Sequence, residues 1–346
     1  MTYTAVLAGC GAMSKGWLEA IKRVPALSEK IKVVGLVDLD AELAATRAAE
    51  AGLSAATGND LEAMLSATKA DLLFDVVPPS ARKDVVLSGL AHGCHVLSEK
   101  PMAVSLRDAD ELIAAARAAG RVHAIVQNRR YIEGVRRIRA FLESGAIGTL
   151  TSLHCDFFLA PHFGGFRDEM EHVLLLDMAI HTFDAARFMA GRVPLAVYAQ
   201  ESNPAGSWYA QGASANAIFE FSDGVIFNYR GSWAAEGAPT SWEGNWRFIG
   251  TNGTLLWDGA EQFTAHVVDG EGKFLSDLRP IEVPPSADES QTHGHASVIA
   301  EFLVAIENGT QPETVGTDNI KSLGMVLAAI ESATTQARVE INHQGA

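Results

Sequence analysis

Lys100 is a residue whose type and position predict a catalytic role. It stands in Cys94 to Pro101, an apolar stretch that reads as a strand and stops on Glu99, Lys100 and a proline, which cannot continue a sheet ladder. In parallel α/β sheets, ligands bind just outside the carboxyl ends of the strands, so Glu99 and Lys100 would point into a cofactor crevice. The alternative is a solvated loop lysine, and Glu-Lys-Pro alone does not decide between the two.

Asp177 and His181 form a second candidate for chemistry. The segment Leu174 to Ala190 reads as one helix, in which Asp177, His181 and Asp184 fall at i, i+4 and i+7 on one face. A carboxylate one turn before a histidine can fix the imidazole tautomer or take part in a proton relay. A zinc site is the rival interpretation, although no His-Glu-x-x-His fingerprint supports it, and we expect no metal. A further ligand for such a site would be His154, His162 or His172.

The start of the chain has the pattern of a dinucleotide-binding unit. Thr4 to Ala8 reads as a strand that runs into Gly9 and Gly11, and Met13 to Val24 reads as a helix. Gly9 permits the tight turn, and Gly11 allows the pyrophosphate to approach the backbone at the helix N-terminus. Ser14 occupies the third glycine position, which affects only how closely helix and strand pack. The predicted phosphate contacts are Gly9, Gly11, Ala12 and Met13.

The second strand, Ile31 to Val37, indicates which dinucleotide is bound. It ends on Asp38, where a dinucleotide fold places an acid on the adenosine ribose hydroxyls. Asp40 adds a second carboxylate and no arginine is adjacent, a combination that would repel a 2′-phosphate. We therefore predict NAD rather than NADP. A solvated loop acid is the alternative, and the glycine turn upstream favours the ribose role.

Three segments carry a resemblance to a known family: Gly9 to Met13, Val96 to Pro101, and Asp177 to Asp184. With them, the whole chain resembles the glucose-fructose oxidoreductase and inositol dehydrogenase family (Gfo/Idh/MocA). The resemblance implies NAD(P)-dependent oxidation or reduction of a sugar or polyol hydroxyl. It also implies that Asp177 and His181 lie opposite the Lys100 strand across the nicotinamide. The second and third segments together are specific, whereas the first is generic.

The resemblance extends to neighbouring loops. It implies that the strand end at Val77 and Pro78 lines the cofactor cleft and that Gln127 to Tyr131 lies beside the nicotinamide; a solvated helix start is the alternative for Arg130. Ala81-Arg82-Lys83 stands where the family usually has a histidine, and Glu169 to His172 replaces glycines. The predicted cofactor contacts from these regions are Val77, Pro78, Glu99, Lys100 and Asn128. The predicted substrate contacts are Lys100, Arg130, Tyr131, His162, Asp177 and His181.

Length and pattern predict two domains in an α/β protein. A chain of 346 residues suits two cores, and its first third alternates strands with helices, as in a parallel sheet. From Leu195 onward, short strands and turns predict an open, mostly antiparallel sheet. We predict an N-terminal Rossmann dinucleotide-binding domain over residues 1–125. A C-terminal α+β domain over residues 126–346 would supply the substrate pocket and an oligomer face, with His293 to Asn308 and Thr317 to Ala337 closing one side of its sheet.

Composition excludes several classes of function. A formal net charge of -15 argues against nucleic-acid binding. No apolar stretch approaches the roughly 20 residues that span a bilayer, so we expect no membrane partner. Three scattered cysteines and no signal peptide indicate a reducing compartment, and we predict a cytoplasmic location. The antiparallel sheet predicted from Leu195 onward offers more apolar surface than the two closing helices cover. This surplus predicts a homodimer or homotetramer. The tryptophans of this sheet, assigned mostly to core or interface, are Trp208, Trp233, Trp242, Trp246 and Trp257.

The predicted function is an NAD-dependent oxidoreductase that transfers hydride between a sugar, inositol or polyol carbon and nicotinamide. His181 would take the hydroxyl proton, Lys100 would hold the same oxygen, and Asp177 would orient or relay. Two alternatives stay open, namely NAD-assisted elimination or glycoside cleavage with cofactor recycling, and a non-catalytic nicotinamide-sensing regulator. His293-Gly294-His295 reads either as a metal fork or as a helix cap at the pocket edge.

Overall fold

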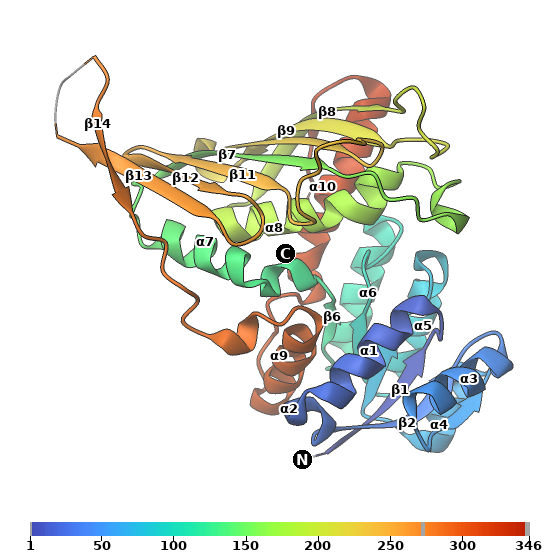
Figure 1. Cartoon of the computed structure of the whole chain (residues 1–346). Coiled ribbons are helices and arrows are strands. Elements are labelled where there is room, and N and C mark those ends of the chain that lie inside the picture. Colours follow the sequence, from blue (N-terminus) through green and yellow to red (C-terminus); the bar gives the residue numbers. More distant parts are fainter. Residues whose placement is uncertain (1, 271–273, 343–346) are drawn as a thin grey trace. The chain divides into compact units, whose positions relative to one another are not determined.

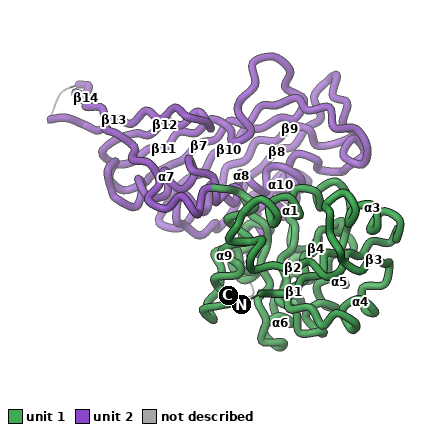
Figure 2. The backbone as a smooth tube through the Cα atoms, turned by 60° about the horizontal axis from the view of Figure 1, so that its bottom comes forward, with its two compact units in different colours: residues 1–128, 293–323, 344–346 green, residues 129–292, 324–343 purple. Residues whose placement is uncertain are grey.

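The computed structural model describes residues 2–270 and 274–342 and divides the chain into two compact units (Figure 1, Figure 2). The first unit contains Met1–Asn128 and His293–Leu323, and the second contains Arg129–Thr292 and Gly324–His343. The first crossing lies close to the predicted boundary after residue 125. The return of 293–323 to the first unit was not predicted, because a later helix carries no sequence signal for the unit on which it packs.

The first unit is a Rossmann domain, as predicted. Its six strands pair in parallel in the order β3-β2-β1-β4-β5-β6, which is the order of dinucleotide-binding folds. In chain order its elements are β1 (Tyr3–Ala8), α1 (Ala12–Arg23), α2 (Pro25–Ser28), β2 (Ile31–Val37), α3 (Ala41–Ala51), β3 (Ala56–Gly58), α4 (Leu61–Thr68), β4 (Leu72–Asp75), α5 (Pro79–Ala91), β5 (His95–Ser98), α6 (Leu106–Ala119), β6 (His123–Ile125) and α9 (His295–Asn308). Helix α9 packs against α1 and α2 rather than on the second sheet.

Local signals explain where these helices begin and end. The side chain of Asp40 accepts hydrogen bonds from the first turn of α3, and Ser105 does the same for α6. Both helices end on glycines in the left-handed conformation, Gly52 and Gly120, which a residue with a Cβ adopts only at a cost. A glycine therefore marks the end of each helix, and the parallel pairing of the strands brings the carboxyl ends of β2 and β5 to one edge of the sheet.

The second unit is built on a nine-stranded sheet of order β14-β13-β12-β11-β7-β10-β9-β8-β15. Among the described strands of this second sheet, only β7 and β10 pair in parallel, so the predicted mostly antiparallel sheet is confirmed. Its elements are α7 (Glu133–Glu143), β7 (Leu150–Phe158), a π-helical turn (Leu174–Ala179), α8 (Ile180–Ala190), β8 (Pro194–Ser202), β9 (Ser214–Phe221), β10 (Ile226–Ser232), β11 (Asn245–Gly250), β12 (Gly253–Trp257), β13 (Phe263–Asp269), β14 (Asp277–Ile281) and β15 (Val339–Glu340). Helix α10 (Gly316–Thr335) begins in the first unit and ends in the second.

The two faces of this sheet differ in composition. Figure 1 shows α7 and α8 beneath one face, where Phe183 packs edge-on against Phe219 and Tyr229. Three of the predicted core tryptophans, Trp233, Trp246 and Trp257, are buried in this cluster. The opposite face is a shallow groove of about 830 Å³ with a polar and aromatic lining that includes His154, Tyr198, Asn216, Ile218 and Arg230.

Two predicted elements differ from the structure. The helix predicted over Leu174 to Ala190 begins with the π-helical turn, so its first residues follow a wider spiral than the α-helix does. The pattern of short strands after Leu195 also predicts a strand over Gly272 to Leu275. That range lies partly outside the described residues, and β14 begins later, at Asp277. None of the described helices combines the length and the apolar character that crossing a bilayer requires.

Candidate active site

The turn after β1 has the backbone geometry that a dinucleotide needs. Gly9 has φ of 93°, and a Cβ there would lie 2.6 Å from the carbonyl carbon of Val76 at the end of the neighbouring strand β4. The turn can therefore close only with glycine at this position. A Cβ on Gly11 would meet no atom within 4 Å, which leaves open space above the turn. That space fits the close approach of a pyrophosphate to the backbone.

The N-terminus of α1 continues this phosphate cradle. Ala12 and Met13 are exposed, and the first turn of the helix contains no acidic residue. Ser14, at the third glycine position, is buried and its hydroxyl donates to the Gly11 carbonyl at 2.6 Å. The serine therefore stabilises the turn instead of obstructing it, and the helix N-terminus presents backbone N–H groups to an anion.

The Asp38 carboxylate is fixed by backbone donors beside the turn. Its Oδ2 accepts from the Cys10 N–H at 2.7 Å and its Oδ1 accepts from the Asp40 N–H at 3.1 Å. Burial, followed by the Asp38 charge, raises the pKa of the Cys10 thiol to about 11, so this thiol is neutral. The carboxylate keeps lone pairs for ribose hydroxyls, and the fixed geometry fits the predicted cofactor contact.

Arg47, which no sequence motif marks as functional, supports the same turn. Arg47 of α3 is buried and donates from Nε and Nη2 to the Cys10 carbonyl at 3.1 and 3.0 Å, and its Nη1 pairs with Glu50. Asp40, predicted to repel a 2′-phosphate, also serves as the N-cap of α3. A periodic helix pattern gives no hint that Arg47 faces inward, because long basic side chains usually lie on the solvated face.

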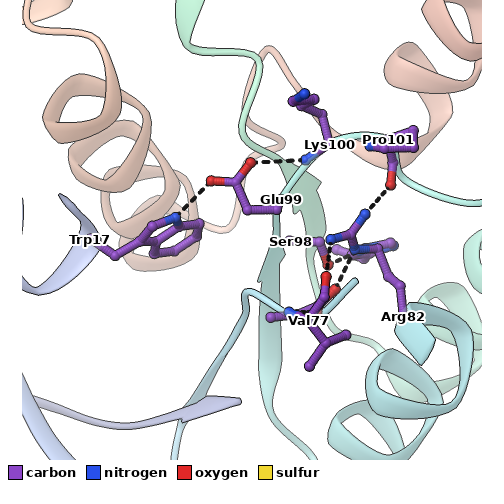
Figure 3. Close-up of polar contacts among 9 residues, drawn as sticks. Trp17, Val77, Arg82, Ser98, Glu99, Lys100 and Pro101 are labelled. Atoms are coloured by element: carbon purple, nitrogen blue, oxygen red, sulfur yellow. Dashed lines mark hydrogen bonds and ion pairs between the residues drawn. The ribbon is translucent and has the colours of Figure 1, made fainter. Parts of the chain in front are cut away.

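The Lys100 segment follows β5 at the same edge of the sheet. Figure 3 shows Glu99 turned toward Trp17, whose indole N–H donates to Oε1 at 2.8 Å. Glu99 is 7% exposed, and its Oε2 accepts from the Lys100 backbone N–H at 3.2 Å. Burial raises the pKa of Glu99, but hydrogen bonds from His295 and Trp17 and the Lys100 charge outweigh it, so the net pKa is lowered. A fixed, ionised Glu99 thus holds the backbone at Lys100, which is partly exposed.

His295 was predicted to be either a metal ligand or part of a helix cap. In the structure it contacts two predicted cofactor residues, Glu99 and Asn128. Its Nε2 lies 3.5 Å from Oε1 of Glu99, and its Nδ1 lies 3.2 Å from the amide nitrogen of Asn128. The amide can only donate in this contact, so Nδ1 accepts and Nε2 carries the proton that faces Glu99. Neither partner is near His295 in sequence, so this network could not be predicted from spacing.

Asp177 and His181 occupy the π-helical turn and the start of α8 in the second unit. Arg167 donates from Nε to Oδ2 of Asp177 at 2.6 Å. His181 is partly exposed and lines a small pocket with Arg129, Trp242 and Glu243. The volume of this pocket, about 10 Å³, is close to that needed for a single water molecule. Burial lowers the pKa of Arg129 to about 10, and its guanidinium pairs with Glu243. The pocket therefore combines an imidazole with charged groups and an aromatic face.

The third member of the predicted row, Asp184, has a structural role instead. It is fully buried and accepts a bidentate pair from Arg130, with both N to O distances 2.7 Å. Arg130 and Tyr131 were predicted to contact substrate, but they are only 3% and 0% exposed. The prediction that Arg130 and Tyr131 contact substrate is therefore wrong, because both side chains pack inside the fold. An exposed salt bridge and a buried one look alike in sequence.

The remaining histidines lie apart from one another. His162 is exposed, stacks on Trp208 with ring centroids 3.6 Å apart, and lies 3.2 Å from Glu236. His154 contacts Ser152, and the His172 imidazole pairs with Glu201 at 2.5 Å. Within residues 2–270 and 274–342, no three His, Cys, Asp or Glu side chains converge as metal ligands would.

Comparisons with known proteins agree with this geometry. Residues 3–127 match the model of the oxidoreductase family with an NAD-binding Rossmann fold, and residues 135–256 match the GFO/IDH/MocA C-terminal domain. The 1,5-anhydro-D-fructose reductase of Ensifer adhaerens is 27% identical over 90% of this chain and 91% of its own. The D-apiose dehydrogenase of Paraburkholderia graminis is 27% identical over 98% and 90% of the two chains.

The fold also matches solved structures. An oxidoreductase from Agrobacterium radiobacter, crystallised with NAD+, L-tartaric acid and magnesium, aligns with a TM-score of 0.85 at 21% identity, covering 99% of each chain. At that identity the likeness shows the fold, and the two matching domain models show the family. This chain belongs to the GFO/IDH/MocA family of oxidoreductases.

Proposed function

We propose that this chain is an NAD-dependent oxidoreductase that transfers hydride between a carbinol carbon of a sugar, inositol or other polyol and nicotinamide. One observation carries the proposal. The glycine turn after β1, Asp38 after β2 and Lys100 after β5 all stand at the carboxyl ends of one parallel sheet, with β4 between β1 and β5. Dinucleotides bind at this edge in doubly wound folds.

The bound nicotinamide would supply the hydride acceptor. In the proposed mechanism, the Lys100 ammonium group donates to the reacting oxygen and stabilises its alkoxide character. The hydroxyl proton passes to the imidazole of His181, a form of general-base help that contributes about 10²-fold to 10⁴-fold. Asp177 orients the imidazole, and Arg167 holds the Asp177 carboxylate in place.

Exposed aromatic rings near His181 support a sugar-like substrate. Trp242 lines the His181 pocket and is 46% exposed, and the ring of Phe163 lies 6.3 Å from it. Aromatic faces of this kind pack on the C–H face of a sugar ring, and charged neighbours such as Glu243 accept from its hydroxyls. The relatives named 1,5-anhydro-D-fructose reductase and D-apiose dehydrogenase agree with this class of substrate.

The finer assignments belong to the same proposal. The Asp38 carboxylate beside the glycine turn favours NAD over NADP as the cofactor. The exposed sheet face with Tyr198 and Ile218 favours assembly into a homodimer or homotetramer. Cys10, Cys94 and Cys155 are all free and buried, which fits the reducing environment of the cytoplasm.

The test is a screen of NADH absorbance with inositols, aldoses and sugar acids, beside a calorimetric titration with NAD. Substrate-dependent net formation of NADH supports the dehydrogenase. Product formation without net NADH identifies elimination or cleavage with cofactor recycling. NAD binding without turnover across the panel identifies a sensor, and absence of NAD binding removes the whole proposal.

A further inference from the structure

We propose that Arg82 is a positioning residue that ties the turn after β4 to the Lys100–Pro101 segment, so that the cofactor loop and the catalytic lysine are held as one rigid piece. The inference rests on the proposed function, since Lys100 is catalytic only there. Nothing about the surrounding helix pattern predicts that this arginine faces inward.

The contacts of Arg82 all lie inside the first unit (Figure 3). Its Nε donates to Oδ2 of Asp75 at 2.8 Å, and its Nη2 donates to the Val77 carbonyl at 2.6 Å. Its Nη1 donates to the carbonyl of Pro101. Three nitrogens thus serve three acceptors on two separate strand ends, β4 and β5. The guanidinium side chain is 1% exposed and Asp75 is fully buried.

A buried ion pair of this kind needs an explanation beyond stability. An apolar pair of similar volume usually fills such a space with no loss of stability, because it avoids the desolvation of two charges. The extra acceptors of Arg82 supply the explanation. The carbonyls of Val77 and Pro101 are backbone groups in irregular segments that the sheet ladder does not satisfy, and a planar fork with five N–H donors reaches both while pairing with Asp75.

The consequence for chemistry follows from the place of these carbonyls in the chain. Val77 precedes Pro78 in the predicted cofactor loop, and Pro101 directly follows Lys100. Fixing both carbonyls on one guanidinium fixes the Lys100 backbone relative to the nicotinamide side of the cleft. Displacement of a catalytic group by about 1 Å can cost on the order of 10²-fold in rate. Arg82 therefore acts on hydride transfer through Lys100 without touching the reacting atoms.

Two variants separate positioning from folding. Arg82→Lys keeps a charge for Asp75 but offers a compact ammonium that cannot hold both carbonyls in one plane. The double variant Asp75→Asn with Arg82→Leu removes both charges. The Asn oxygen can still accept from the Val77 N–H, as Oδ1 of Asp75 does at 3.2 Å, while the two carbonyls lose their donor. The control is Lys83→Met, on the next residue of α5, whose partly exposed ammonium pairs with Asp108 and Glu111 rather than with the β4 or β5 strand ends.

The measurements are thermal unfolding, single-turnover hydride transfer at saturating NAD and substrate, and NADH binding by fluorescence. We expect both Arg82 variants to fold and to lose on the order of 10²-fold in the transfer rate with the substrate KM changed less than about threefold. NADH affinity should fall about 10-fold, since Val77 lies in the cofactor loop. Lys83→Met should match the wild type in all three measurements.

The inference is overturned when folded Arg82→Lys retains transfer and NADH affinity within about threefold of wild type, a change too small for a displaced catalytic group. If the double variant fails to fold, Arg82→Lys alone decides. NADH binding needs no substrate, so it tests Arg82 even where the panel yields no turnover. Wild-type NADH binding without turnover contradicts the proposed function. In folded Arg82→Lys, unchanged NADH binding contradicts the role of Arg82 when transfer is also unchanged or when no substrate is found.

Discussion

The Nε of Arg167 lies 2.6 Å from Oδ2 of Asp177, so the carboxylate proposed to orient His181 is itself held by an arginine. The guanidinium carbon of Arg167 lies 4.8 Å from the ring centre of Phe163 and 4.7 Å from that of Phe166. Two aromatic contacts and one charge-assisted hydrogen bond therefore restrict this side chain. Arg167 lies five residues after His162, which was predicted to contact substrate, so the same segment also holds a carboxylate of the proposed proton relay.

Removing this arginine should slow turnover more than it destabilises the fold. We expect Arg167→Met to lower kcat about 10-fold, which corresponds to the loss of about 1.4 kcal/mol from one charge-assisted hydrogen bond in the transition state. Arg338→Met is the matched control, because Arg338 makes a similar surface pair with Glu220. Steady-state kinetics beside thermal unfolding measure both effects, and equal kcat in the two variants would exclude a role for Arg167.

Cofactor choice should depend on the Asp38 carboxylate. Asp38→Ser combined with Leu39→Arg should move the NAD to NADP ratio of kcat/KM toward NADP by more than about 10-fold, since the ribose acceptor is lost and a phosphate partner is gained. Asp38→Asn is the control, because its amide oxygen still accepts from the Cys10 N–H, as Oδ2 of Asp38 does. Equal use of NAD and NADP by the wild type contradicts this assignment.

Much of the first unit could be predicted because its signals are local. The alternation of strands and helices and the terminal Gly52 each act within a few residues of the element that they define. The Asp40 cap is equally local, although Asp40 was predicted only to repel a 2′-phosphate. Gly9 could be predicted for the same reason, since its tight turn follows directly from β1. These signals place the cofactor side of the proposed site at one edge of the sheet.

What could not be predicted depends on partners that are distant in sequence. Arg130 and Asp184 stand 54 residues apart, and nothing in either segment shows that they form a buried pair. His295 reaches Glu99 only because α9 returns to the first unit. Periodicity also fails at the π-helical turn, where the apolar pattern of Leu174 to Ala179 suits a regular helix equally well. Spacing alone therefore finds the catalytic candidates but not the residues that hold them.

Oligomerisation should depend on the uncovered face of the second sheet. Trp233, Trp246 and Trp257 are buried in the core, so the apolar surface available for a partner comes instead from Ile218 and Tyr198 on the outer face. We expect Ile218→Lys to shift the protein toward a monomer of 36.8 kDa at micromolar concentration, measured by light scattering. Val304→Lys is the control, because Val304 is similarly exposed but lies on α9. A monomeric wild type refutes the prediction.

His123 should make the fold sensitive to acid. Burial, followed by the Arg82 charge, lowers the pKa of His123 to about 3. The unfolded chain, with a histidine pKa of about 6.5, therefore takes up the proton first as the pH falls, and stability is lost from about pH 6.5 toward pH 3 at up to about 1.4 kcal/mol per pH unit.

Replacement of His123 should remove this part of the pH dependence. We expect the free energy of unfolding of His123→Gln to fall less steeply than that of the wild type between about pH 6 and pH 4, where the histidine titrates only in the unfolded chain. Urea titrations at several pH values measure the slopes, and values near pH 8 provide the internal control. Parallel curves for the two proteins would show that His123 does not contribute.

Lys100→Met separates a catalytic lysine from a solvated one. Methionine keeps most of the stem but lacks the donor that meets the reacting oxygen, so the glycine turn and the Glu99 contacts with Trp17 and the backbone should survive. Loss of one preorganised donor at a developing oxyanion costs on the order of 3 kcal/mol, or about 10²-fold in turnover. A solvated lysine replaced in the same way changes stability by no more than about 0.5 kcal/mol and leaves the rate intact.

The experiment pairs calorimetric NAD titration with single-turnover reduction of NAD, using Lys22→Met as the control. Lys22 lies on α1 and contacts only the exposed Ala51 carbonyl at 3.3 Å among the described residues, so its loss should affect neither measurement. We expect Lys100→Met to bind NAD as the wild type does and to fail in hydride transfer. The opposite result is NAD binding with a hydride-transfer rate within about threefold of wild type. Such a rate change is far smaller than the change expected from losing one oxyanion donor. The reacting oxygen would then not depend on Lys100, and the chemistry would be assigned to His181.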